Sequence, residues 1–291
     1  MSEAMEPQTN RHAELAVRLL RDASDLGDIW RLRGRWDDAL VLLRGVLPVA
    51  ADQSDAALAR VCLALARVLT EEGMFGSYDT LAEREALLDE AQARADRAGE
   101  PLLLGNVLDA RGMSLHATFL ESAERQEPAN ELELFERGLA WRRQAGDPRT
   151  IAESLFHVGL VYSVVRHDHA RALPYFDEAY RTAQAAGDHV IASYAIRHIG
   201  FAQHDAGNDA AARAALVESL ELRERAGFIP GVAMALVALA YADTDRGELD
   251  QAMAHLDRAR EIFLSLGAAS RGPWVEQIAK ELRQEHAERR G

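Results

Sequence analysis

The chain has 291 residues and a formal net charge of −14, and its hydrophobic fraction of 48% and charged fraction of 27% are ordinary for a folded protein. The negative charge argues against nucleic acid as a partner, because binding to phosphates needs a concentrated basic surface. The single cysteine, Cys62, excludes an internal disulfide, and the longest apolar run, residues 231–242, is shorter than the ~20 residues that span a bilayer. We therefore expect a cytoplasmic protein that does not contact membranes, and the single lysine among many arginines indicates a bacterial source.

The first predicted helix pair occupies residues 10–51. Its centre, LGDIWRLRGRWDDALVLL, has a glycine break at Gly34 that separates two stretches with apolar residues at helical spacing. In the second stretch these residues share one helical face: Trp36, Ala39, Leu40 and Leu43. One helix pair cannot bury its apolar face alone, so we expect the pattern to recur along the chain.

Glycine marks the end of every later helix pair. Five amphipathic segments finish with a glycine, at near-constant intervals of roughly 40 residues: Gly99, Gly146, Gly187, Gly227 and Gly267. Glycine directly after a helix adopts the left-handed conformation without steric cost, so each one predicts a helix end. The intervals divide the chain into units at residues 55–99, 101–146, 149–187, 189–227 and 230–267, and a last amphipathic helix is expected at 271–288.

The fourth, fifth and sixth units align with one another. Gly159 in the fourth unit corresponds to Gly200 in the fifth, and Phe176 corresponds to Leu216 and Leu256. Small residues on one helix allow a second helix to approach closely, and large residues fill the seam between them. We predict that Phe176, Leu216 and Leu256 are equivalent buried positions.

The pattern resembles the tetratricopeptide repeat (TPR) family, whose units carry leucine-glycine, an aromatic residue three positions later, and alanine in the second helix. Leu26-Gly27, Trp30 and Ala39 match it here. The resemblance covers nearly the whole chain, with units longer than the family's usual length of about 34 residues, as in bacterial regulatory arrays. It implies an all-α fold in a single domain, residues 1–291: a right-handed TPR-like α-solenoid of six helix pairs plus a C-terminal capping helix.

In this family the first helices of successive units line a concave groove, and the resemblance implies a ligand groove here. The groove candidates are Arg67, Asp109, Met113, His116, Glu153, Phe156, Leu160, Ser163, Tyr194, Arg197, Phe201, His204, Tyr241 and Asp245. One row of groove positions is polar throughout: Thr70, His116, Ser163, His204 and Thr244. The neighbouring row is mostly apolar, so the groove would suit a partly apolar ligand held by a few directed hydrogen bonds. An ordinary solvated helix face carries the same residue types, and that alternative stays open.

Signals for cofactors, metals and catalysis are weak. No stretch has the form of a glycine-rich phosphate loop, and His167-Asp168-His169 lies in a predicted turn without further ligands at helical spacing. We therefore expect neither a cofactor nor a metal ion, and Cys62 is typical of a packing residue. No catalytic residue is assigned. If the protein is an enzyme, the candidates are acid–base groups of the groove: His204, Asp205, Arg197 and His116.

Two functions of different classes remain open. The first is a cytoplasmic binding or regulatory protein that holds a peptide or protein partner in its concave groove, by analogy with repeat arrays of this kind. The second is a small-molecule-binding protein, or an atypical enzyme, with a pocket in the groove for a small, partly apolar molecule. The shape of the groove separates them, since a closed pocket of roughly 300–1,000 Å³ favours a small molecule and an open trough favours a peptide.

Overall fold

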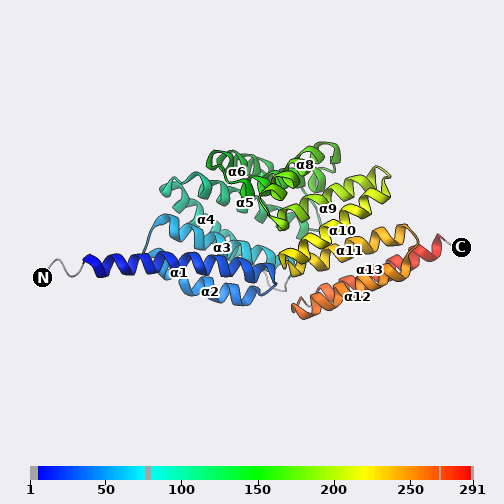
Figure 1. Ribbon diagram of the computed structural model, residues 1–291, viewed down its shortest axis with the longest axis horizontal. Helices are drawn as coiled ribbons and strands as arrows, with labels where there is room; N and C mark the ends of the chain where they lie inside the picture. Colours follow the sequence, from blue (N-terminus) through cyan, green and yellow to red (C-terminus); the bar gives the residue numbers. More distant parts are fainter. Residues whose placement is uncertain (1–5, 76–79, 269, 290–291) are drawn as a thin grey trace. The chain divides into compact units, whose positions relative to one another are not determined.

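The computed structural model describes residues 6–75, 80–268 and 270–289, and these residues form thirteen α-helices and no strand (Figure 1). The helices are α1 (Glu6–Leu32), α2 (Trp36–Ala51), α3 (Asp55–Phe75), α4 (Leu81–Ala98), α5 (Pro101–Glu121), α6 (Glu131–Ala145), α7 (Pro148–Leu160), α8 (His169–Ala185), α9 (His189–Asp205), α10 (Asp209–Ala226), α11 (Ile229–Asp245), α12 (Leu249–Ser265) and α13 (Arg271–Glu288). A π-helical turn, Val161–Val165, continues α7. The all-α prediction is confirmed. Of the described helices, none is long and apolar enough to cross a membrane.

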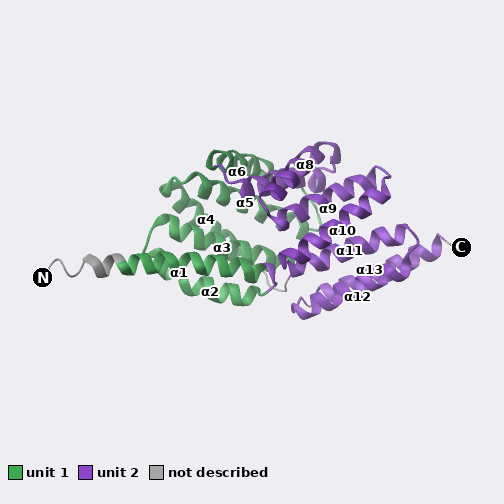
Figure 2. Cartoon of the chain, viewed as in Figure 1, with its two compact units in different colours: residues 1–31, 35–74, 78–145 green, residues 32–34, 75–77, 146–291 purple. Residues whose placement is uncertain are grey.

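Contacts within the chain divide it into two compact units (Figure 2). Unit 1 comprises residues 1–31, 35–74 and 78–145, and unit 2 comprises residues 32–34, 75–77 and 146–291. The main boundary falls at Gly146, the glycine that ends the third predicted repeat. Helices α7 to α13, which carry the fourth, fifth and sixth predicted repeats and the last helix, therefore all belong to unit 2.

The helix ends follow from local residues. At the starts of α7, α8 and α9 an aspartate side chain accepts a hydrogen bond from a backbone N–H of the first turn: Asp147, Asp168 and Asp188. At the other ends, all five predicted glycine stops have a positive φ, between 65° and 77°. Only glycine adopts this conformation without a clash of its Cβ atom, so the predicted helix ends are confirmed at these positions.

In unit 1, α5 and α6 pack closely because glycine faces glycine. A Cβ atom on Gly105 would lie 3.0 Å from the backbone oxygen of Gly138 and 2.8 Å from Cγ of Arg142. The Arg142 side chain crosses this contact fully buried, and it donates from Nη1 to Asp109 Oδ1 (2.8 Å) and from Nε to Asn106 Oδ1 (2.9 Å). The fold of unit 1 thus supplies a carboxylate for its buried arginine.

In unit 2, the helices pair through the predicted seams. Phe176, Leu216 and Leu256 are 1%, 4% and 1% exposed, which confirms that they are buried. A Cβ atom on Gly159 would lie 2.7 Å from the ring of Phe176, so only glycine admits the phenyl group there. At the equivalent Gly200, Cδ2 of Leu216 lies 3.5 Å from the same point. Each of these seams therefore combines a close helix approach with one large side chain.

Candidate functional site

Unit 2 contains a cavity of about 390 Å³ that is walled by four helices. Helix α9 contributes Arg197, Gly200, Phe201 and His204, and α10 contributes Asp209, Ala212 and Leu216. Helix α11 contributes Met234, Val237, Ala238, Tyr241, Ala242 and Asp245, and α13 contributes Trp274. The walls are mainly apolar, and the charged side chains that line the cavity lie at its two ends.

The two long walls are single faces of α9 and α11. On α9, Arg197, Phe201 and His204 follow one another at four and three residues, so they share one face over two turns. On α11 the lining runs from Met234 to Asp245 with the same spacing. Because seven residues rise about 10 Å along a helix, Arg197 and His204 mark opposite ends of the cavity wall.

One end of the cavity is lined by the half-buried Arg197, and a second arginine, Arg223, is buried close to it without lining the cavity. The guanidinium of Arg197 stacks on Phe201, with Cζ 4.5 Å from the ring centroid, and its Nε is buried without a hydrogen-bond partner. Arg223 is 1% exposed, stacks on Tyr194 at 5.0 Å, and donates from Nη1 to the carbonyl oxygen of Gly231 at 2.6 Å. Within the described part of the chain, neither guanidinium forms an ion pair with a carboxylate.

The charge at this end is therefore unbalanced. Burial, together with the positive charge of Arg223, lowers the pKa of Arg197 to about 9. Burial also lowers the pKa of Arg223, to about 10. Both pKa values lie above 7, so both groups are charged at neutral pH. Removing a charge from water without a counter-ion costs free energy, for Arg223 fully and for the half-buried Arg197 in part, and an anion that enters the cavity recovers part of it.

The other end is acidic and faces solvent. The side chain of His204 is 52% exposed; its Nδ1 lies 3.3 Å from Asp209 Oδ1 and its Nε2 lies 3.8 Å from Asp245 Oδ2. Asp245 Oδ1 also accepts from Arg289 Nη2 at 2.9 Å. Tyr241, between the two ends, is 43% exposed and forms an aromatic edge of the cavity. Each aspartate at this end therefore has a basic partner, in contrast to the arginines at the other.

The polar groups of the lining are few. Among the described residues that line the cavity, the side chains with a titratable group are Arg197, His204, Asp209, Tyr241 and Asp245. The imidazole of His204 is already directed at Asp209 and Asp245. The cavity can enclose an apolar group of a ligand, and it places the guanidinium of Arg197 beside that group.

Five of the groove residues predicted from the sequence line this one cavity: Arg197, Phe201, His204, Tyr241 and Asp245. The sequence reasoning missed Leu216, which was assigned only to the seam, and Trp274. Trp274 carried a signal as a large aromatic residue on the apolar side of the last helix. Only the tertiary fold, which packs α13 against α11 and α12, brings it to the cavity.

The polar row of predicted groove positions does not line a groove as expected. Four of its members are buried: Thr70, His116, Ser163 and Thr244. The two threonines donate to carbonyl oxygens one turn earlier on their own helices, and the serine Oγ lies 3.1 Å from a ring nitrogen of His169. The histidine Nδ1 lies 2.7 Å from Glu131 Oε1. These positions are polar because buried hydrogen-bonding groups pair inside the protein, and only His204 of the row is exposed.

Several other predicted groove residues pack inside their own units. Phe156 and Leu160 are buried, and Tyr194 stacks on Phe156 with ring centroids 5.3 Å apart. Asp109 is 1% exposed and accepts from the buried arginine of α6, and Met113 is half-buried. These side chains therefore lie against neighbouring helices of their own units and do not line the α9–α11 cavity.

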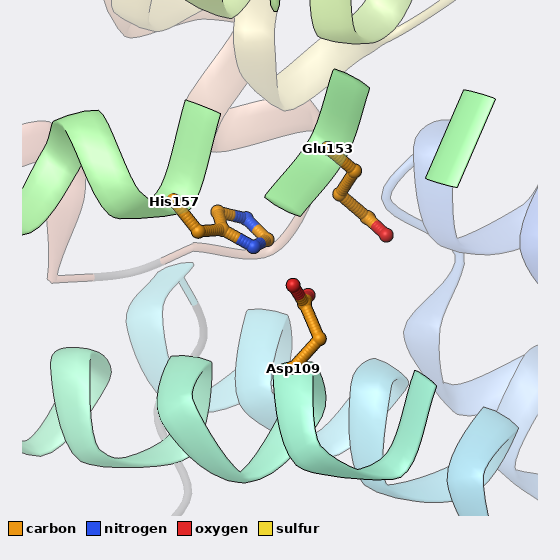
Figure 3. A group of neighbouring side chains, drawn as sticks. All are labelled: Asp109, Glu153 and His157. Atoms are coloured by element: carbon orange, nitrogen blue, oxygen red, sulfur yellow. The ribbon is translucent and has the colours of Figure 1, made fainter. Parts of the chain in front are cut away.

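The remaining predicted residues lie elsewhere. Arg67 lines a cavity of about 580 Å³ in unit 1, together with residues of α1, α3 and the start of α5. Glu153 and His157 lie one turn apart on α7 of unit 2 (Figure 3).

The acid–base pair considered for an enzyme does not form. Asp205 Oδ2 lies 3.1 Å from His169 Nε2 and is not part of the cavity lining, whereas His204 is directed at Asp209. Of the other two candidates, Arg197 lines the cavity and His116 is buried with its glutamate in unit 1. Of the four candidate residues, only His204 and Arg197 therefore line the cavity.

No protein-family model and no curated protein sequence matches the chain. Among solved structures it is similar to BtubC (BKLC) from P. vanneervenii, with 17% sequence identity and a TM-score of 0.52, over 88% of this chain and 91% of that one. It is also similar to a Signal Transduction ATPase with Numerous Domains protein with a tetratricopeptide repeat sensor from Pyrococcus horikoshii, with 15% identity and a TM-score of 0.58, over 91% of this chain and 44% of that one. At these identities the likeness concerns the fold, which is a helical-repeat fold similar to that of tetratricopeptide repeats.

Proposed function

We propose that the chain is a regulatory binding protein of the TPR family, in its long-repeat form, and that unit 2 holds a peptide or protein partner. The observation that carries the proposal is the apolar cavity between the α9 and α11 faces, with Tyr241 exposed at its edge. Binding energy at protein interfaces concentrates in a few large side chains that fill such pockets. An apolar or aromatic side chain of the partner would occupy the cavity.

The test is a peptide display selection on the full chain, repeated on two variants. Ala242 lines the cavity, so Ala242→Trp fills it, while Ala211 is exposed on α10 outside the lining, so Ala211→Trp adds the same side chain elsewhere. We expect the enriched peptides to share an apolar anchor and to bind Ala242→Trp at least about tenfold more weakly than the parent, since the loss of a main anchor contact costs about 2 kcal/mol or more. Equal binding to all three proteins, or no enrichment, would contradict the proposal.

A small, partly apolar molecule is the second candidate ligand, and the cavity volume favours it. About 390 Å³ lies within the range of roughly 300–1,000 Å³ that is typical of small-molecule sites. Native mass spectrometry of the protein purified from its own host separates the candidates. Loss of the bound mass from Ala242→Trp but not from Ala211→Trp places it in the cavity; a mass too small for a peptide then favours the small molecule, and a mass that fragments into amino acids favours the peptide.

A further inference from the structure

Apolar contact alone does not account for Arg197 at one end of the cavity, beside the positive charge of Arg223. We propose that Arg197 is an anion-binding residue, and that it receives a carboxylate which the partner carries beside its apolar anchor. This inference rests on the proposed function and names the class of peptide that the cavity selects. Such a peptide has an apolar or aromatic residue with a carboxylate beside it, supplied by a neighbouring acidic residue or by the C-terminus of the chain.

The contrast with other arginines supports this reading. Arg213, on the same helix as Arg223, donates from Nε to Asp243 Oδ1 at 2.7 Å, and the carboxylate of Asp243 is fully buried. In unit 1, Arg142 has its own buried carboxylate at 2.8 Å. Arg213 and Arg142 thus each have an acidic partner within the fold, and among the described residues no carboxylate pairs with Arg197.

The geometry of Arg197 leaves its donors available. One face of the guanidinium covers the ring of Phe201, which itself lines the cavity, and the described residues accept no hydrogen bond from its N–H groups. A guanidinium held flat in this way matches the two oxygens of a carboxylate. Arg223 does not line the cavity, so its positive charge acts on the site without a direct contact to the ligand.

The rest of the lining favours a carboxylate over a phosphate. The far end of the same wall carries Asp209 and Asp245, so a doubly charged group would be repelled more strongly than a singly charged one. Between the two ends the wall is apolar, with Phe201, Val237 and Trp274 along it. A ligand with one carboxylate and one apolar body therefore complements both parts.

The test uses three small probes on the full chain: 3-phenylpropanoate, its neutral analogue 3-phenylpropanamide, and phenyl phosphate. Binding is followed by NMR through the indole N–H signal of Trp274, which the Trp274→Phe variant assigns. We expect the dissociation constant of the carboxylate to be at least about tenfold lower than that of the amide, as a charge-assisted bidentate contact implies. The preference should disappear in Arg197→Met. It should persist in Arg225→Met, which removes an arginine of α10 whose side chain is 62% exposed.

Four outcomes would overturn the proposal: equal binding of carboxylate and amide to the parent, a carboxylate preference that survives Arg197→Met, phenyl phosphate binding tighter than the carboxylate, or binding of no probe at millimolar concentration. The first comparison needs no variant, so it holds even if Arg197→Met fails to fold. Failure here is distinguishable from failure of the proposed function. Displayed peptides that bind through the cavity without any acidic preference would leave the peptide-binding proposal standing and remove only the role of Arg197.

Discussion

Arg142 in unit 1 and Arg197 in unit 2 differ in whether the fold supplies a carboxylate for the guanidinium, although Arg142 is fully buried and Arg197 is half-buried. In unit 1, the side chain of Arg142 has no exposed surface, and its guanidinium contacts the carboxylate of Asp109 and the amide oxygen of Asn106. In unit 2, Arg197 lies against an aromatic ring, with its Nε buried and unpaired and the buried Arg223 nearby. The first charge is balanced by the fold itself. The second is balanced by nothing in the described residues of unit 2.

This difference separates a structural arginine from one that is available to a ligand. Removing one partner of a buried ion pair leaves the other charge uncompensated and strongly destabilises a protein. Removing a buried charge that has no partner relieves a desolvation cost instead. The same substitution, arginine to methionine, should therefore lower stability at Arg142 and leave it unchanged or raise it at Arg197.

The largest expected effect is that of Arg142→Met. It leaves the carboxylate of Asp109 buried without its cation, and we expect the free energy of unfolding to fall by about 3–5 kcal/mol. Denaturant-induced unfolding followed by circular dichroism measures it, with Arg143→Met, at the exposed neighbouring position, as control. A loss below about 1 kcal/mol would mean that the pair contributes little and that the contrast between the units is not energetic.

Phe176→Ala provides an apolar reference in unit 2. The ring is 1% exposed and fills the space that Gly159 leaves, so truncation opens a cavity, and we expect a loss of about 3–5 kcal/mol. The matched control is Leu264→Ala on α12, where the leucine is 51% exposed. If the Phe176→Ala protein melts like the parent, the predicted seam register does not determine the stability of unit 2.

Arg197→Met should leave stability unchanged or raise it by about 1 kcal/mol, because methionine occupies a similar volume without a charge to desolvate. Thermal and denaturant unfolding of the variant and the parent measure the difference. A loss of more than about 2 kcal/mol would show that the stacking of Arg197 on Phe201 is structural, and the contrast with Arg142 would then disappear.

The smallest effect on stability is expected for His204→Ala. Its side chain is 52% exposed and its contact with Asp209 is long, at 3.3 Å, so the free energy of unfolding should change by no more than about 0.5 kcal/mol. Binding of the peptides selected on the parent should weaken, since His204 lines the cavity. Unchanged binding with a clear loss of stability would assign His204 to packing.

Most of the fold could be predicted from the sequence because its signals are local. The glycine stops at Gly146, Gly187 and Gly227 have the positive φ that their place after a helix requires, and Phe176 fills the seam that its spacing indicates. Helix ends depend on residues within one turn, and helical faces depend on spacing along one segment, so both can be read without the tertiary structure.

The site could be predicted only in part, because pairing across helices leaves no local signal. The spacing of Arg197 and Phe201 indicated one wall correctly, but nothing near Asp109 in sequence shows that Arg142, on the next helix, takes its carboxylate. Trp274 was missed for the same reason, since it reaches the cavity from the last helix. Whether a buried polar residue faces a ligand or a partner within the fold is a property of the packed helices.

The most direct test of the central claim is the stabilisation of the protein by 3-phenylpropanoate, measured for the parent and for Arg197→Met in the same unfolding experiment. A ligand that binds only the folded state raises the free energy of unfolding by RT ln(1 + [L]/Kd). We predict that the parent gains stability as the probe concentration rises, whereas Arg197→Met, at least as stable as the parent without the probe, gains much less. If Arg197→Met is less stable than the parent without the probe and gains as much with it, Arg197 belongs to the packing of unit 2 and does not bind the ligand.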